Sequence, residues 1–195
     1  MKVVAVVQAR MGSTRLPGKV LKPVDGLPLI ELLLGRLRRA RRVDEIVVAT
    51  TESDQDEPLL KVVEHLGFRT VRGSERDVLA RYASAAEVCE ADVVVRITGD
   101  CPLIDPELVD QVVDLFLSDG VDYASNSYPP TFPDGLDVEV FTRAALIEAV
   151  SAATETFDRE HVTPYIRRNA RSSAVVSSET DYSGLRWTVD DPEDL

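Results

Sequence analysis

The chain has 195 residues, of which 44% are hydrophobic and 29% charged, values typical of a single globular domain. Its two cysteines, Cys89 and Cys101, are too few for a disulfide scaffold, and the apolar run Val3–Val7 is too short for a signal peptide or a membrane span. We therefore expect a cytoplasmic protein without membrane association. The formal net charge of −12 excludes a general nucleic-acid binder, because a phosphate backbone requires a basic surface.

Short β-branched runs alternate with amphipathic segments along the chain. The predicted strands are Lys2–Val7, Glu45–Thr51, Arg69–Arg72, Asp92–Thr98, Asp122–Ser125 and Asp137–Phe141, with a further strand around Trp187–Val189. The predicted helices are Leu29–Ala40, Glu57–Leu66, Arg76–Glu87, Pro106–Leu117, Arg143–Ala153 and Arg159–Asn169. This alternation predicts a doubly wound α/β fold with a mostly parallel sheet, in one domain spanning residues 1–195.

The segment Asp191-Pro192-Glu193-Asp194 has the pattern of a helix start, with Asp191 as N-cap and proline in the first helical position. The printed chain stops at Leu195, one residue after this pattern. We therefore expect the domain to lack its C-terminal helix.

The strongest local signal is the segment Gln8–Lys19, which follows the first predicted strand. Its glycines allow backbone N–H groups to point inward, while its cations and hydroxyls suit phosphate oxygens. These residues are Gly12, Gly18, Arg10, Arg15, Lys19, Ser13 and Thr14. The segment does not fit the Walker pattern, because no Ser or Thr follows Gly18-Lys19, and it does not fit the dinucleotide glycine pattern, because its glycine spacing differs. We interpret the segment as a loop that binds the phosphates of a nucleoside triphosphate.

The alternative is a surface loop with incidental cations. Residues 1–42 hold 10 of the 22 Lys and Arg residues but only two acids, a local charge of +8, which weakens that alternative. Part of this charge has a simpler explanation, because the arginines between residues 36 and 42 suit the solvated face and last turn of a helix.

Two aspartates follow predicted strands, at the sheet edge where α/β proteins bind ligands. Asp100 comes after Asp92–Thr98, and Asp190 comes after the strand around Trp187–Val189. Because Mg²⁺ is usually held by one or two carboxylates together with substrate phosphates, this pair predicts a magnesium site. The alternative is that Asp190 or Asp191 only caps the next helix, and we assign that role to Asp191.

Two neighbours of Asp100 have simpler interpretations. Asp105 precedes Pro106 and is expected to cap a helix. Cys101 has no identifiable histidine partner, so we interpret it as a packed thiol and not a nucleophile.

Five motifs in order along the chain resemble the cytidylyltransferase superfamily, and specifically its spore-coat polysaccharide biosynthesis protein F type. They are residues 8–19, Gly-Ser-Glu-Arg-Asp-Val-Leu-x-Arg-Tyr at 73–82, Arg-x-Thr-Gly-Asp-Cys-Pro-Leu-Ile-Asp-Pro at 96–106, Asp-Gly-Leu-Asp-Val-Glu at 134–139 and Arg-Glu-His-Val-Thr-Pro-Tyr at 159–165. The resemblance implies a nucleotide-diphospho-sugar transferase-like fold. It also implies an enzyme that couples CTP to a sugar or sugar acid with release of pyrophosphate, in surface polysaccharide biosynthesis.

The chain is more distantly similar to enzymes that activate ulosonic acids as CMP-sugars. This similarity implies that Asp100 and Asp190 bind Mg²⁺ and act in catalysis together with Arg15 and Lys19. The nucleotide-binding residues implied are Gln8, Ala9, Arg10, Gly12, Ser13, Arg15, Lys19, Ser74, Thr98 and Gly99. Two positions depart from the octulosonate enzymes, which have Gln in place of Thr98 and Glu in place of Cys101.

The implied reaction is attack by a sugar hydroxyl on the α-phosphorus of CTP, in which positioning and charge neutralisation supply most of the catalysis. The group that removes the hydroxyl proton stays open, with Asp190 and a water on the metal ion as candidates. For the sugar we predict contacts from Asp137 and Glu139, which alternate onto one face of a strand. The family resemblance alone adds Glu160 and His161 as substrate-binding residues. Alternatively, Asp137 and Glu139 form an exposed polar face, Glu160 is a first-turn acid, and Ser74 is a plain N-cap.

Two other functions remain open from the residues. A glycosyltransferase could share the sheet and the carboxylate after a strand, although the Lys19 loop favours nucleotidyl transfer. An inactive nucleotide-binding partner in a polysaccharide pathway is the second alternative. Because related synthetases are often dimers, a homodimer is possible.

Overall fold

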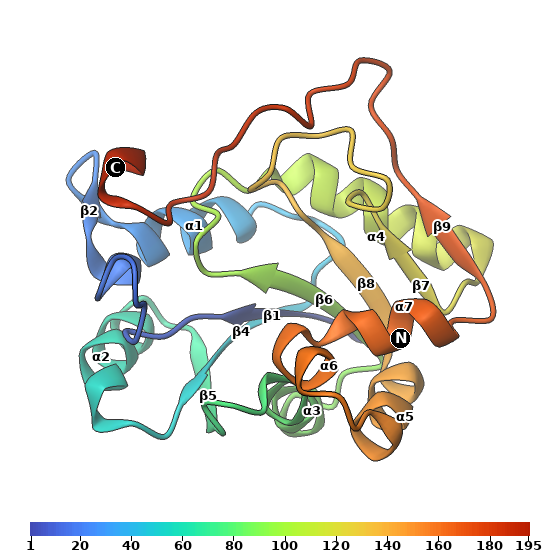
Figure 1. Cartoon of the computed structure of the whole chain (residues 1–195), viewed down its shortest axis with the longest axis horizontal. Helices are drawn as coiled ribbons and strands as arrows, with labels where there is room; N and C mark the ends of the chain where they lie inside the picture. The colour runs from blue at the N-terminus through green and yellow to red at the C-terminus, as the bar shows by residue number, and fades with distance from the viewer.

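The computed structural model describes all residues from 1 to 195 and contains a seven-stranded sheet with helices on both faces (Figure 1). The strand order is β5-β4-β1-β6-β8-β7-β9. The strands are β1 Val3–Gln8, β4 Glu45–Thr51, β5 Arg69–Gly73, β6 Val93–Thr98, β7 Tyr123–Ser125, β8 Glu139–Thr142 and β9 Ser173–Val175, and a small hairpin is formed by β2 Pro23–Val24 and β3 Leu27–Pro28. Only β8 runs antiparallel to its neighbours, so the sheet is mostly parallel as predicted.

The helices are α1 Leu29–Leu37, α2 Glu57–His65, α3 Val78–Val88, α4 Pro106–Asp119, α5 Arg143–Ala152, α6 Thr156–His161 and α7 Thr163–Asn169. Side chains alternate across each strand, so Val3, Ala5 and Val7 of β1 join the core under α1, α2 and α4. Val4 and Val6 join a second core under α3, α5 and α7. The prediction of a doubly wound α/β fold is therefore confirmed.

The chain reverses direction across the sheet at β1. From β1 it moves outward through β4 to β5, and it then returns to the other side of β1 as β6. A crevice opens at the carboxyl ends of the strands wherever such a reversal occurs. The loops after β1 and β6 therefore lie where this architecture binds ligands.

Aspartates begin the helices near that crevice. The Asp105 carboxylate accepts a hydrogen bond from the Glu107 N–H at 2.9 Å and caps α4, as predicted. The Asp77 carboxylate accepts from the Ala80 N–H at 3.0 Å, so Asp77 and not Ser74 is the N-cap of α3. Helix α3 consequently begins at Val78, later than predicted.

The predicted helix Arg159–Asn169 is wrong, because the structure has two helices there. Val162, with φ of 70° and ψ of −59°, lies between α6 and α7 and interrupts the helical backbone. Pro164, in the first turn of α7, has no N–H with which to continue the hydrogen bonds of α6. The break turns α7 away from α6 and leaves α6 at the mouth of the crevice.

The predicted strand around Trp187–Val189 is also wrong. The segment is extended, but it is paired with another segment only by a single parallel β-bridge, between Asp134 and Arg186. At this crossing a Cβ on Gly135 would lie 2.8 Å from the Trp187 carbonyl carbon, so only glycine fits. This segment is part of the C-terminal stretch, drawn in red, that runs from β9 across the top of Figure 1 and ends beside β2.

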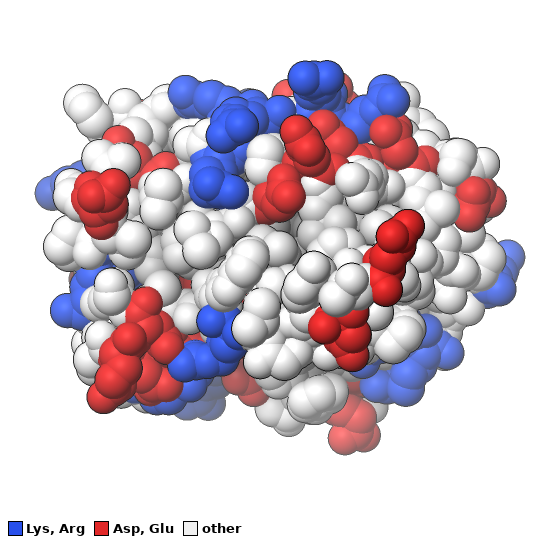
Figure 2. Space-filling model, turned by 90° about the horizontal axis from the view of Figure 1, so that it is seen from above, with Lys and Arg blue, Asp and Glu red and all other residues white.

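The pattern at Asp191 forms a short 3-10 helix over Pro192–Asp194. No helix of the structure has the length and apolar character needed to cross a membrane. Viewed from above, acidic and basic side chains surround a central area with few charges (Figure 2).

Candidate active site

A cavity of about 760 Å³ lies at the carboxyl ends of β1 and β6. Its walls come from the loop after β1, the start of α3, the loop after β6, helix α6 and the C-terminal segment. It brings together most of the predicted site residues: Gln8, Ala9, Arg10, Ser13, Arg15, Lys19, Thr98, Gly99, Asp100, Glu160, His161 and Asp190. Side chains more than 170 positions apart in the sequence thus line one cavity, because the fold places their loops at one sheet edge.

Gly99 joins the loops after β1 and β6. Its N–H donates to the Gln8 carbonyl at 2.8 Å, which extends the pairing of these strands. A Cβ at position 99 would lie 2.7 Å from the same oxygen and 2.9 Å from the Ala9 Cβ. Glycine is therefore required for the close approach that places Asp100 opposite the first loop.

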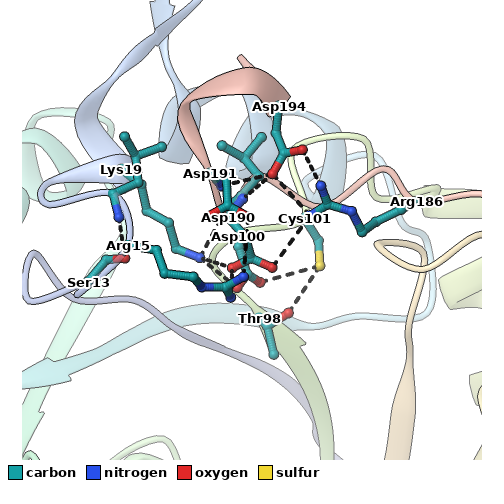
Figure 3. Close-up of polar contacts among 12 residues, drawn as sticks. Ser13, Arg15, Lys19, Thr98, Asp100, Cys101, Arg186, Asp190, Asp191 and Asp194 are labelled. Atoms are coloured by element: carbon teal, nitrogen blue, oxygen red, sulfur yellow. Dashed lines mark hydrogen bonds and ion pairs between the residues drawn. The ribbon is translucent and has the colours of Figure 1, made fainter.

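Lys19 lies between the two predicted metal ligands (Figure 3). Its Nζ is 2.9 Å from Asp100 Oδ2 and 2.9 Å from Asp190 Oδ1, and it also donates to the Val189 carbonyl at 3.0 Å. The Lys19 side chain is only 13% exposed. One cation position is therefore shared by two carboxylates that come from opposite ends of the chain.

The charges of this group stabilise one another. Burial lowers the pKa of the Lys19 ammonium, but the Asp100 and Asp190 carboxylates raise it more, so that its pKa lies above the ordinary value. Burial also raises the pKa of Asp100, but Lys19 and the Thr98 hydroxyl outweigh burial and lower it overall. Both groups consequently stay ionised at neutral pH.

Cys101 lies beside Asp100 with its thiol sulfur 3.0 Å from the Thr98 hydroxyl. Burial, and next the negative charge of Asp100, raise the pKa of this thiol well above its usual value. A protonated, 1% exposed thiol is a poor nucleophile, in agreement with the interpretation as a packed residue.

The two arginines of the first loop make ion pairs at the mouth of the cavity. Arg15 Nη2 lies 2.8 Å from Asp190 Oδ1, and Nη1 lies 3.4 Å from Asp191 Oδ2. Arg10 Nη1 lies 2.8 Å from Glu75 Oε1. Because these pairs are partly exposed, they are weak, and both guanidinium groups can exchange a carboxylate for a phosphate at small cost.

Asp56 binds the backbone of the loop after β1. It was not among the predicted site residues. Its carboxylate, 1% exposed, accepts from the Met11 N–H at 2.7 Å, the Thr51 N–H at 3.0 Å and the Thr50 hydroxyl at 2.8 Å. Burial raises the pKa of Asp56, but these donors, with the Thr51 hydroxyl foremost, lower it overall. The sequence shows Asp56 only as one acid in an acidic turn, so no local pattern distinguishes it.

Helix α6 forms the wall opposite the first loop. Glu160 and His161 line the cavity, and the His161 ring contacts that of Phe157 at 4.4 Å between centroids. The Arg159 guanidinium donates to Asp77 Oδ2 at 2.6 Å and 2.9 Å, and so ties α6 to the start of α3. The role of Arg159 depends on a contact 82 positions away, which no local pattern reveals.

Four predicted residues do not line the cavity, namely Gly12, Ser74, Asp137 and Glu139. The Ser74 hydroxyl accepts from the Asp77 N–H within the turn before α3. Asp137 accepts from the Ser127 hydroxyl at 2.7 Å.

Glu139 departs furthest from expectation, because it is 3% exposed. Its carboxylate pairs with Arg96 Nη1 at 2.6 Å and accepts from the Tyr123 hydroxyl at 2.7 Å. The expected placement of Glu139 beside a sugar is therefore corrected: it forms a buried ion pair between β6, β7 and β8.

The donor set at Lys19 suits a magnesium ion that arrives with a nucleotide. Two carboxylates face one position, and the structure contains no cluster of three or more His, Cys, Asp or Glu residues able to hold a metal. Mg²⁺ prefers oxygen ligands and commonly combines one or two carboxylates with phosphate oxygens and water. Asp100 and Asp190 therefore fit the ion if phosphates supply other ligands and Lys19 moves toward those phosphates.

Three known proteins are similar to this chain. The Bacillus subtilis spore coat polysaccharide biosynthesis protein SpsF is 38% identical over 86% of this chain and 70% of its own length. A 3-deoxy-manno-octulosonate cytidylyltransferase from Pelobacter propionicus is 37% identical over 61% of this chain, and the match spans 46% of that enzyme. The structure of a cytidylyltransferase from Leptospira borgpetersenii is 38% identical, with a TM-score of 0.95, over all of this chain and 83% of that one.

A sequence profile described as cytidylyltransferase matches residues 4–189. Of the functions that the residues left open, nucleotidyl transfer is the one that this match supports. The match includes the loop after β1 and Asp100, and it ends at Val189, directly before Asp190. The chain belongs to the cytidylyltransferase family, whose members are nucleotidyltransferases.

Proposed function

We propose that this protein transfers the cytidylyl group of CTP to a hydroxyl of a sugar or sugar acid, with Mg²⁺ held by Asp100 and Asp190, and that it serves surface polysaccharide biosynthesis. The observation that carries the proposal is the convergence of Lys19, Asp100 and Asp190 within 2.9 Å contacts in the main cavity. The names of the similar proteins, one in polysaccharide biosynthesis and one acting on octulosonate, support the sugar substrate.

In this reaction the acceptor oxygen forms a bond to the α-phosphorus of CTP while the bond from that phosphorus to the bridging oxygen of the β-phosphate breaks. The products are a cytidylyl sugar and pyrophosphate, and the acceptor hydroxyl releases one proton. Arg10, Arg15 and Lys19 bind the phosphate oxygens and neutralise the charge that develops on the leaving group. When bound, Mg²⁺ supplies further charge neutralisation and fixes the geometry of the phosphates.

The acceptor is expected on the α6 side of the cavity. Glu160 and His161 line the cavity there and offer a carboxylate and an imidazole for sugar hydroxyls. Gln8, Ala9, Thr98 and Gly99 form the floor between β1 and β6, where a nucleotide is held at the carboxyl ends of the strands.

The direct test is pyrophosphate release from a panel of nucleoside triphosphates with sugars and sugar acids in the presence of Mg²⁺. We expect release with CTP and at least one sugar or sugar acid, and a loss on the order of 100-fold or more in Asp100→Ala. Asp105→Ala is the matched control, because Asp105 caps α4 outside the cavity.

The outcomes separate the parts of the proposal. If no nucleotide and acceptor pair releases pyrophosphate, the transfer reaction is excluded. If release is normal in Asp100→Ala, the transfer reaction survives but the assignment of Asp100 as a metal ligand is wrong. Release with UTP in preference to CTP would correct the nucleotide alone.

A further inference from the structure

Asp194 binds the backbone that carries Asp190 (Figure 3). Its Oδ2 accepts hydrogen bonds from the N–H groups of both Asp190 and Asp191, each at 2.8 Å. The Arg186 guanidinium pairs with both oxygens of the same carboxylate, through Nη1 at 3.0 Å and through Nη2. The Asp194 side chain is only 13% exposed, although the residue lies in a short surface helix.

This contact matters because Asp190 belongs to no strand. The N–H of the preceding residue, Val189, donates to the Asp100 carbonyl at 2.9 Å, and this is the last backbone hydrogen bond before Asp190. Beyond it, the N–H groups of Asp190 and Asp191 have the Asp194 carboxylate as their partner. The direction of the Asp190 side chain toward Lys19 and Asp100 thus depends on a carboxylate that does not line the cavity.

We propose that Asp194 is a positioning residue for nucleotidyl transfer, whose carboxylate binds the Asp190 and Asp191 N–H groups and so fixes Asp190 opposite Asp100. The inference rests on the proposed function, because it takes Asp190 as a metal ligand. Replacement of groups that orient metal ligands commonly lowers metal affinity or activity by about 10-fold to 100-fold. Arg186 supports Asp194 by neutralising its charge and holding its orientation.

A purely structural role is the competing explanation. A carboxylate at the end of a short helix that accepts N–H groups at its start stabilises the turn, whether or not that turn carries a ligand. Such a role affects the melting temperature but does not act through Asp190. The two explanations therefore differ in whether the effects of Asp194 and Asp190 on turnover are independent.

The test compares Asp194→Ala, Asp190→Ala and the double variant, with Asp194→Asn as the conservative variant and Glu193→Ala as the control. Glu193 is exposed and neighbours Asp194 in the same turn. Amide hydrogen exchange at residues 190 and 191 is measured by NMR without nucleotide or metal, and kcat and KM by pyrophosphate release. In Asp194→Ala we expect amide exchange about 10-fold faster and kcat lower by about 10-fold to 100-fold.

The double variant should be no slower than Asp190→Ala, since Asp194 acts through Asp190. Asp194→Asn keeps one acceptor oxygen and should recover most of the exchange protection, and Glu193→Ala should match the unmodified protein. The inference is overturned if exchange at residues 190 and 191 is unchanged in Asp194→Ala, or if the double variant multiplies the two single losses. Full turnover in Asp190→Ala would instead count against the proposed metal site, while the exchange measurement still decides whether Asp194 holds this backbone.

Discussion

Lys19 and Asp100 reach the cavity from loops that directly follow the parallel strands β1 and β6, whereas Asp190 reaches it from an extended segment that belongs to no strand. The first pair is held by the strand ladder, by Gly99 and by buried Asp56. The backbone that carries Asp190 is held by the crossing at Gly135, by the Val189 N–H on the Asp100 carbonyl and by Asp194, while its carboxylate pairs with Lys19 and Arg15.

This difference separates two ways of placing a catalytic group. A loop between a strand and a helix is positioned by both elements, so several hydrogen bonds together hold a side chain on that loop in place. An extended segment outside the sheet is held by only a few contacts, so the loss of any one of them is expected to shift the side chains that the segment carries. We therefore expect changes in the strand-supported region to affect either chemistry or overall stability, and changes along the extended segment to act on the position of Asp190.

The largest effect is expected for Lys19→Met. Pyrophosphate release should fall on the order of 100-fold to 1000-fold, because the ammonium that we propose binds the phosphates is lost while the side-chain length is kept. Mg²⁺ binding without nucleotide should become tighter by calorimetry, since Asp100 and Asp190 lose the cation between them. Lys61→Met, on an exposed position of α2, is the control. Unchanged Mg²⁺ affinity in Lys19→Met would contradict a shared cation position.

Asp56→Ala tests the support of the first loop. The free energy of unfolding should fall by about 3 kcal/mol in chemical denaturation, because the Met11 and Thr51 N–H groups lose a buried acceptor.

The pH dependence of that difference follows from the lowered pKa of Asp56. An acid whose pKa is lowered by folding contributes stability above its unfolded pKa of about 3.9, and this contribution is lost as the pH falls through the lower folded value. The ionic part of the gap between Asp56→Ala and the unmodified protein should therefore shrink below about pH 4. A gap that stays constant into strong acid would mean that packing, and not the ionised carboxylate, holds the loop.

Gly135→Ala tests the crossing that supports Asp190. The new Cβ would lie 2.8 Å from the Trp187 carbonyl carbon and 2.9 Å from the Thr188 nitrogen, at a residue whose φ is 105°. We expect a loss of about 2 kcal/mol in the free energy of unfolding, together with reduced pyrophosphate release. Gly184→Ala is the matched control, because no atom lies within 4 Å of its Cβ position. If both variants unfold alike, the crossing does not constrain the segment.

Asp134→Asn should have the smallest effect and the opposite sign. Although Asp134 is exposed, partial loss of hydration around its carboxylate, and next the repulsion from the Asp137 carboxylate, raise its pKa, so its ionised form disfavours the folded state. The substitution should stabilise the protein at pH 7, by less than about 1 kcal/mol because the residue is exposed, and the gain should vanish below about pH 4, where the aspartate is protonated in both states. Thermal melting at the two pH values is the measurement, and destabilisation at pH 7 would show that a hydrogen bond of Asp134 outweighs the repulsion.

Much of the region around Lys19 and Asp100 was predictable, because the sequence patterns that indicate it are local. The β-branched runs of β1 and β6 are nearly continuous, as in strands buried on both faces, the cations Arg10, Arg15 and Lys19 fall within ten residues, and Asp100 comes two residues after the end of β6. The parallel order of these strands then requires their loops to meet at one edge. These facts depend on neighbouring residues and on a general rule of the fold.

The sequence by itself determined the α/β alternation, the glycine-containing cationic loop Gln8–Lys19 and the aspartate after β6. Only the tertiary structure decided that Glu139 is buried against Arg96, that Val162 divides a predicted helix, that Asp56 supports the first loop, and that Asp194 holds Asp190. For Glu139 and Asp56 the reason is separation along the chain: periodicity and capping arise from interactions within a few residues, whereas Glu139 meets Arg96, 43 positions away, and Asp56 meets Met11, 45 positions away. The contacts of Asp194 are local, but their importance follows from the place that the fold gives Asp190 beside Lys19. Hydrophobic patterning records burial but carries no information on which polar partner a buried carboxylate will meet.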